Sequence, residues 1–120
     1  MTAIRILIVD DDGEFADGLA ELIELDGHDV RIVATGAQGV TAAVEEAYDI
    51  VLMDIGLPDI DGVECLRRIR ALKPGVHALL MTGYSSEQLR ANAIEFGALE
   101  VMTKPLDIDS LLKRLAAASD

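Results

Sequence analysis

Five short apolar runs alternate with five longer segments in which apolar residues recur at helical spacing. This alternation constrains the fold more than any other feature of the chain. A short apolar run between turn residues is typical of a strand buried on both faces, and strands that alternate with helices are typical of a parallel sheet. The expected strands are Ile4–Val9, Asp29–Val33, Ile50–Met53, His77–Met81 and Ala98–Met102.

The fold class that follows is α/β, a doubly wound sheet with helices on both faces. Crossovers between parallel strands are almost always right-handed, which leaves few ways to connect five strands in one sheet. The simplest is the flavodoxin-like (βα)5 arrangement, with five parallel strands in the order 2-1-3-4-5. A chain of 120 residues has the size of one such domain.

Helix-capping residues separate the expected strands from the helices. Asp12 and Asp61 can cap the first and third helices, and Thr35–Gln38 and Ser85–Gln88 have the form of capping boxes. The apolar residues that define the helical faces are Phe15, Leu19, Leu22 and Ile23; Val40, Val44 and Ala47; Val63, Leu66 and Ile69; Leu89, Ala93 and Phe96; and Ile108, Leu111, Leu112 and Leu115.

Charge and cysteine content limit the classes of partner. The chain has 22 acidic and 10 basic residues and a net charge of −12, which argues against direct binding to nucleic acid or to an anionic membrane. The single Cys65 cannot form an internal disulfide and fits a reducing compartment. No apolar stretch reaches membrane-spanning length, and the N-terminus lacks a signal-peptide layout. We therefore expect a cytoplasmic protein.

Polar residues follow four of the five expected strands. Asp10 and Asp11 end the first strand, Asp54 the third, Thr82 the fourth, and Lys104 follows the fifth. In an open parallel sheet the carboxyl ends of the strands meet at one edge, where ligands bind. We therefore expect these side chains to converge.

Such a group of residues suits Mg²⁺-assisted phosphoryl transfer. Three clustered carboxylates repel one another unless a cation neutralises them, and an oxygen-only ligand set suits Mg²⁺. Lys104 could pair with a phosphoryl oxygen, Thr82 could donate a hydrogen bond to another, and a carboxylate can act as the nucleophile. Taken singly, each residue could equally be a helix cap, a turn residue or a solvated charge.

The ordered set of motifs resembles the receiver domain of bacterial two-component response regulators. The resemblance spans essentially all 120 residues, and it rests on several short stretches in their order along the chain. These are Leu7-Ile8-Val9-Asp10-Asp11-Asp12, Met53-Asp54 with Leu57-Pro58 and Asp61-Gly62, Met81-Thr82-Gly83, and Gly97-Ala98 leading to Lys104-Pro105.

The resemblance implies a role for each site residue. Asp54 would be phosphorylated by a histidine kinase, Thr82 would bind the incoming phosphoryl group, and Lys104 would pair with it. The Mg²⁺ ligands would be Asp10, Asp11, Asp54 and the backbone carbonyl of Gly56. The bond before the proline that matches Pro105 is usually cis in this family.

The resemblance also implies partners. The phosphodonor would be a histidine kinase or a histidine phosphotransfer protein. The signal would pass to a downstream protein or to an output domain absent from this sequence, and phosphorylation could drive dimerisation. We expect residues 1–120 to be a single receiver domain without an output domain. We also expect it to be a signalling domain rather than an enzyme, with self-catalysed phosphotransfer and slow autodephosphorylation.

One departure from the family pattern concerns the conformational switch. The family usually has an aromatic residue three positions before the lysine, and here that residue is Val101. Valine is short and stiff at χ1, so it is a poor substitute for a rotating ring. Tyr84, two residues after Thr82, is the alternative. We expect Thr82, Tyr84 and Val101 to link phosphorylation to a surface formed by the fourth helix, the fifth strand and the fifth helix.

Two other functions fit parts of the sequence. Asp10-Asp11-Asp12-Gly13 also fits the D-x-D-G signature of haloacid-dehalogenase-like phosphatases, in which Asp10 would be the nucleophile and Asp12 the acid/base. That reading leaves Asp54 without a role. A degenerate receiver that acts only as a docking module is the other alternative, and the complete set of site residues argues against it.

Overall fold

A single parallel sheet forms the centre of the computed structural model, which describes residues 3–84 and 86–118. Its strands lie in the order β2-β1-β3-β4-β5, which confirms the expected topology. The strands are β1 (Arg5–Val9), β2 (Asp29–Val33), β3 (Ile50–Asp54), β4 (His77–Thr82) and β5 (Glu100–Thr103). The last strand begins later than expected because the N–H of Ala98 is used in the preceding turn, where it donates to the carbonyl of Ala93.

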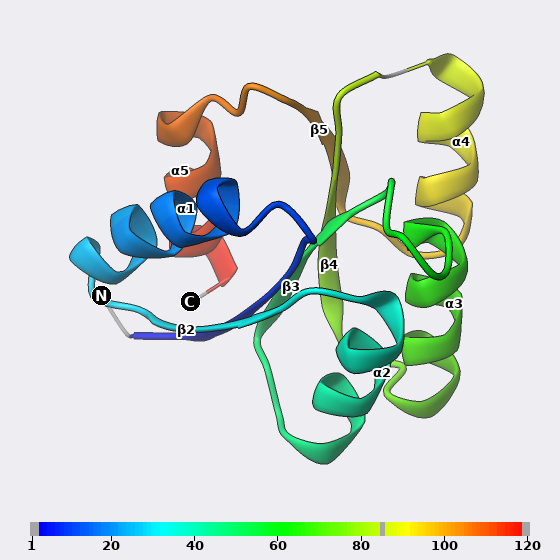
Figure 1. Ribbon diagram of the computed structural model, residues 1–120, viewed down its shortest axis with the longest axis horizontal. Helices are drawn as coiled ribbons and strands as arrows, with labels where there is room; N and C mark the ends of the chain where they lie inside the picture. Colours follow the sequence, from blue (N-terminus) through cyan, green and yellow to red (C-terminus); the bar gives the residue numbers. More distant parts are fainter. Residues whose placement is uncertain (1–2, 85, 119–120) are drawn as a thin grey trace.

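Within the described residues, five helices cover the two faces of the sheet. They are α1 (Gly13–Leu25), α2 (Gly36–Glu45), α3 (Gly62–Leu72), α4 (Glu87–Glu95) and α5 (Ile108–Ala118). Figure 1 shows α1 and α5 on one face and α2, α3 and α4 on the other. Alternate residues of β1 point into the two resulting cores: Ile6 and Ile8 into the first, and Leu7 and Val9 into the second.

The helices begin at the caps that the sequence indicates, with one shift. The Asp12 carboxylate accepts from the N–H of Phe15, and Thr35 forms a complete capping box with Gln38. The box predicted to start at Ser85 begins at a residue outside the described ranges. The cap that α4 shows is Ser86, whose hydroxyl accepts from the N–H of Leu89.

The predicted inner face of α2 is only partly right: Val40 packs half-buried against the core, but Val44 and Ala47 do not form its inner face. The buried positions of α2 are Gly36, Gly39, Ala42 and Ala43, whereas Val44 is 37% exposed and Ala47 lies beyond the end of the helix. The cause is the short distance between α2 and β1: a Cβ on Gly39 would lie 2.9 Å from Cγ2 of Val9. Only small residues fit where α2 packs on β1, so the positions of the larger apolar residues do not identify the buried face of this helix.

Two other residues assigned to helical faces, Leu22 and Phe96, are exposed and not buried. Leu22 lies at the edge of the α1 face, which is formed by Ala16, Leu19, Ala20 and Ile23. Phe96 is the C-cap of α4 and is 40% exposed. Within residues 3–84 and 86–118, every helix is too short or too polar to cross a lipid bilayer.

Candidate functional site

Three carboxylates meet at the carboxyl end of the two central strands. Val9 and Met53 are register partners in β1 and β3, so Asp10 and Asp54 come at the same level of the sheet. One carboxylate oxygen from each of Asp10, Asp11 and Asp54 lies within 4.8 Å of the others. Asp10 is only 1% exposed, whereas Asp11 is open to solvent. Like charges this close are stable as carboxylates only when a nearby cation balances them.

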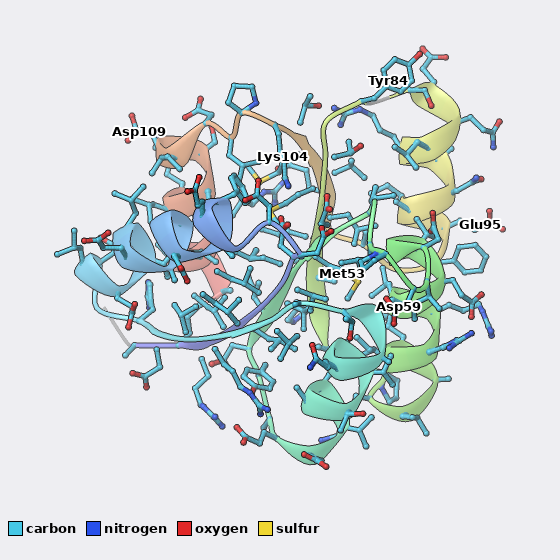
Figure 2. The ribbon with its side chains drawn as sticks, viewed as in Figure 1. Met53, Asp59, Tyr84, Glu95, Lys104 and Asp109 are labelled. Atoms are coloured by element: carbon cyan, nitrogen blue, oxygen red, sulfur yellow. The ribbon has the colours of Figure 1, made fainter. Side chains whose placement is uncertain are left out.

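Lys104 supplies part of that compensation. Its Nζ lies 2.8 Å from Oδ2 of Asp10 and 3.5 Å from Oδ1 of Asp54. The Lys104–Pro105 peptide bond is cis, as the resemblance implied. The backbone N–H of Lys104 donates to the carbonyl of Thr82, which ties the segment after β5 to the end of β4. Figure 2 shows Lys104 beside the start of α1.

Burial and neighbouring charges shift the pKa values of Asp54 and Lys104. Burial raises the pKa of the Asp54 carboxyl above its ordinary value; Lys104 opposes this shift and the charge of Asp10 adds to it. Burial acts to lower the pKa of Lys104, but its hydrogen bond to Asp10 and the charges of Asp10 and Asp54 raise it overall. Lys104 is therefore an ammonium at neutral pH, and it balances only one of three neighbouring carboxylates.

The remaining donors fit a hard divalent cation. The cluster offers only oxygen ligands. Mg²⁺ prefers oxygen ligands and is usually bound by a few carboxylates together with water molecules. Gly56 follows Asp54 in the exposed loop after β3, and its N–H helps to lower the pKa of Asp54. The residues present therefore fit a Mg²⁺ site.

Thr82 lies at the same edge, but its hydroxyl is used locally. Its Oγ1 donates to the carbonyl of Tyr84 at 2.7 Å and accepts from the N–H of Tyr84 at 3.1 Å. Tyr84 itself is 80% exposed and points away from the sheet, in the loop just before α4 (Figure 2). Val101, in contrast, is buried. In this structure the hydroxyl thus bonds to the loop after β4 rather than to the acidic cluster.

A further residue, Asp59, supports the loop that follows Asp54. Its carboxylate oxygens accept from the N–H groups of Gly36 at 2.8 Å and Ala37 at 2.9 Å, at the N-terminus of α2. These bonds lower the pKa of Asp59. Asp59 lies beside the start of α2 (Figure 2), so the loop is fixed at a second point. This contact could not be predicted, because no local sequence pattern relates Asp59 to a helix start so far away in the chain.

Comparison with known proteins agrees with the geometry. The family model of the response regulator receiver domain matches residues 6–116. The chain is a response regulator receiver domain. This identification confirms the resemblance, and the acidic cluster fits the phosphorylation site of such a domain. Neither the phosphatase nor the docking-only alternative gains support.

Relatives of this receiver domain include longer proteins. The transcriptional regulatory protein ZraR of Escherichia coli K12 is 37% identical over 115 residues, which are 96% of this chain but 26% of ZraR. The chain thus spans about a quarter of that relative.

Solved receiver structures superpose over nearly the whole chain. A CheY-like receiver domain protein from Methanospirillum hungatei has a TM-score of 0.91 and 34% identity, covering 97% of this chain and 93% of that one. A chain of the CheX–CheY–BeF3–Mg²⁺ complex of Borrelia burgdorferi has a TM-score of 0.89 and 27% identity, covering 95% of this chain and 87% of that one.

Proposed function

We propose that Asp54 accepts a phosphoryl group, in a Mg²⁺-dependent reaction, from a phosphohistidine of a histidine kinase or histidine phosphotransfer protein. The observation that carries this proposal is the convergence of Asp10, Asp11 and Asp54 within 4.8 Å, with Lys104 against two of them. The presence of BeF3 and Mg²⁺ in the Borrelia complex supports the same chemistry for this chain.

The contacts favour Asp54 over Asp10 as the nucleophile. Both oxygens of Asp10 are engaged, Oδ1 by the N–H of Asp12 and Oδ2 by Lys104, and the side chain is closed to solvent. Asp54 keeps 13% of its side chain exposed, and its contact with Lys104, at 3.5 Å, is longer than that of Asp10. A phosphodonor can therefore reach Asp54 but not Asp10.

Each residue then has a defined part in the transfer. An Asp54 oxygen attacks phosphorus, the phosphorus–nitrogen bond breaks, and the donor imidazole keeps the electron pair and takes up a proton. Asp10, Asp11, Asp54 and the Gly56 carbonyl would hold Mg²⁺, which supplies charge neutralisation for the phosphoryl oxygens. Lys104 pairs with one phosphoryl oxygen. Because these groups all belong to the receiver, a small phosphodonor should suffice, and slow hydrolysis should follow.

Phosphoryl uptake from acetyl phosphate tests this proposal. We expect the wild-type domain to take up one phosphoryl group when Mg²⁺ is present and none in EDTA, measured by intact-protein mass spectrometry. Asp54→Asn, which keeps the shape of the side chain but removes the nucleophile, should take up none. Uptake by Asp54→Asn equal to that of the wild type would refute the assignment.

We also propose that Thr82 and Tyr84 link this reaction to the surface formed by α4, β5 and α5, and that Val101, which is short, contributes little to the link. The Thr82 hydroxyl has one proton, which it now gives to the Tyr84 carbonyl. To donate to a phosphoryl oxygen it must release that carbonyl, which frees the loop before α4. The surface beyond includes a groove of about 560 Å³ between α4, β5 and α5, suited to a downstream protein or a second copy. Buried Val101 underlies this groove.

Hydrogen exchange with and without beryllofluoride tests the switch. We expect Tyr84→Ala to bind beryllofluoride as the wild type does, but to lose most of the change in amide exchange across α4 and β5. Val101→Ala, the matched control on β5, should keep that change. A full response of α4 in Tyr84→Ala would exclude Tyr84 from the switch.

A further inference from the structure

Phe15 contacts Lys104 in a way that ordinary core packing does not require. The Lys104 Nζ lies over the Phe15 ring, 4.2 Å from the ring centroid. Phe15 is half-buried at the margin of the first core, whereas the fully buried face of α1 is made by other residues. The ring therefore lies between the apolar core and the charged site (Figure 2 shows Lys104 beside the start of α1).

The contact completes a closed circuit of four interactions that begins and ends at Asp10. Asp10 Oδ1 accepts from the N–H of Asp12 at 2.9 Å, and Asp12 Oδ1 accepts from the N–H of Phe15 at 3.1 Å. The Phe15 ring meets the Lys104 ammonium, which returns to Asp10 Oδ2 at 2.8 Å. The first turn of α1 thus fixes both the carboxylate and the aromatic face that hold the same ammonium.

We infer that Phe15 is a positioning residue that holds Lys104 in the site through a cation–π contact. The inference rests on the proposed role of Lys104 in phosphoryl transfer. A lysine ammonium is a compact charge on a flexible four-carbon stem, so its position depends on the groups around it. The negative face of an aromatic ring attracts such a cation, and an aliphatic side chain of similar size does not.

The contact matters most when Asp54 changes state. Phosphorylation turns the Asp54 carboxylate into an acyl phosphate whose own carboxyl oxygens no longer share a full charge, so the 3.5 Å contact with Lys104 weakens and a phosphoryl oxygen becomes the stronger partner. Asp10 and the Phe15 ring are then the two fixed neighbours of the ammonium. Lys104 can move toward the phosphoryl group without leaving the site for solvent.

Substitutions of Phe15 separate packing from the cation–π contact. Phe15→Leu keeps apolar volume but removes the ring, and Phe15→Tyr keeps the ring. Val30→Ala is the matched control, because Val30 packs half-buried against the same core but pairs with Ile6 near the other end of the sheet. The first readout is the proton NMR shift of the Lys104 ε-methylene, which a ring face moves upfield. The second is the initial rate of phosphorylation by acetyl phosphate at saturating Mg²⁺.

We expect the wild type and Phe15→Tyr to show an upfield Lys104 ε-methylene relative to Lys73 and Lys113. Phe15→Leu should lose that shift and phosphorylate about threefold to tenfold more slowly. Val30→Ala should be less stable but unchanged in both readouts. An ordinary Lys104 shift in the wild type, which needs no variant to fold, would overturn the inference. So would a Phe15→Leu rate equal to that of the wild type.

The two readouts also keep this inference distinct from the proposed function. If the wild type shows the upfield shift but takes up no phosphoryl group, the proposed function fails while the contact stands. If the wild type is phosphorylated but Lys104 shows no shift, the proposed function stands and the positioning role of Phe15 fails.

Discussion

Replacing Asp10 with Asn should weaken Mg²⁺ binding by at least about tenfold and also release Lys104 from its main partner. The Asn amide could still accept from Asp12 through its oxygen, but its NH₂ group would face the Lys104 ammonium, donor against donor. An unpaired, partly buried donor costs about 1–3 kcal/mol, so the free energy of unfolding should fall as well.

Asp11→Asn is the matched control for that prediction. Asp11 belongs to the same oxygen cluster, but it is exposed. It should therefore lose Mg²⁺ affinity without a comparable loss of stability. Calorimetric titration with Mg²⁺ and urea unfolding of both variants measure the two effects. Unchanged Mg²⁺ affinity in both variants would remove the metal assignment.

A single methyl group at Gly62, the first residue of α3, should strongly destabilise the packing of α3 against the end of β3. A Cβ there would lie 2.6 Å from the carbonyl oxygen of Asp54 and 2.7 Å from the Cα of Ile55. Both are backbone atoms, and the Gly62 N–H is itself bonded to the Ile55 carbonyl. Because backbone cannot rotate away as a side chain can, Gly62→Ala should cost about 3 kcal/mol or more, and it should displace Asp54.

Gly18→Ala is the control, with an expected change of opposite sign. Gly18 is exposed within α1, and no atom lies within 4 Å of a Cβ built there. Alanine in place of a helical glycine stabilises by about 0.5–1 kcal/mol. Urea unfolding of both variants, with phosphorylation of Gly62→Ala as a second readout, tests the comparison. Equal stability of Gly62→Ala and the wild type would show that α3 does not pack against the end of β3 as described.

The sheet and the position of its site could be predicted because both follow from local patterns. Buried parallel strands appear in the sequence as short apolar runs, and alternating units leave little choice of order. Once the order is known, residues that end the central strands must meet. The proximity of Asp10 and Asp54 could therefore be predicted from the strand order alone. The register of Val9 with Met53 places the two aspartates as neighbours.

Features that depend on the distance between elements were not predictable. The inner face of α2 is made of small residues because Gly39 packs directly on Val9, a spacing that periodicity cannot reveal. The bonds from Gly36 and Ala37 to Asp59 join segments that share no sequence signal. Likewise, the sequence marks Phe15 only as a core residue, and its contact with Lys104 appears only when α1 and the segment after β5 are placed together.

Locating the phosphoryl group tests the central claim most directly. The domain is treated with acetyl phosphate and Mg²⁺, the acyl phosphate is reduced with borohydride to a stable residue, and the modified peptide is sequenced by mass spectrometry. The account predicts modification at Asp54 alone, since Asp10 is enclosed by Asp12 and Lys104. Modification at Asp10 would instead support phosphatase chemistry, and no modification at any carboxylate would contradict the account by leaving only a docking role.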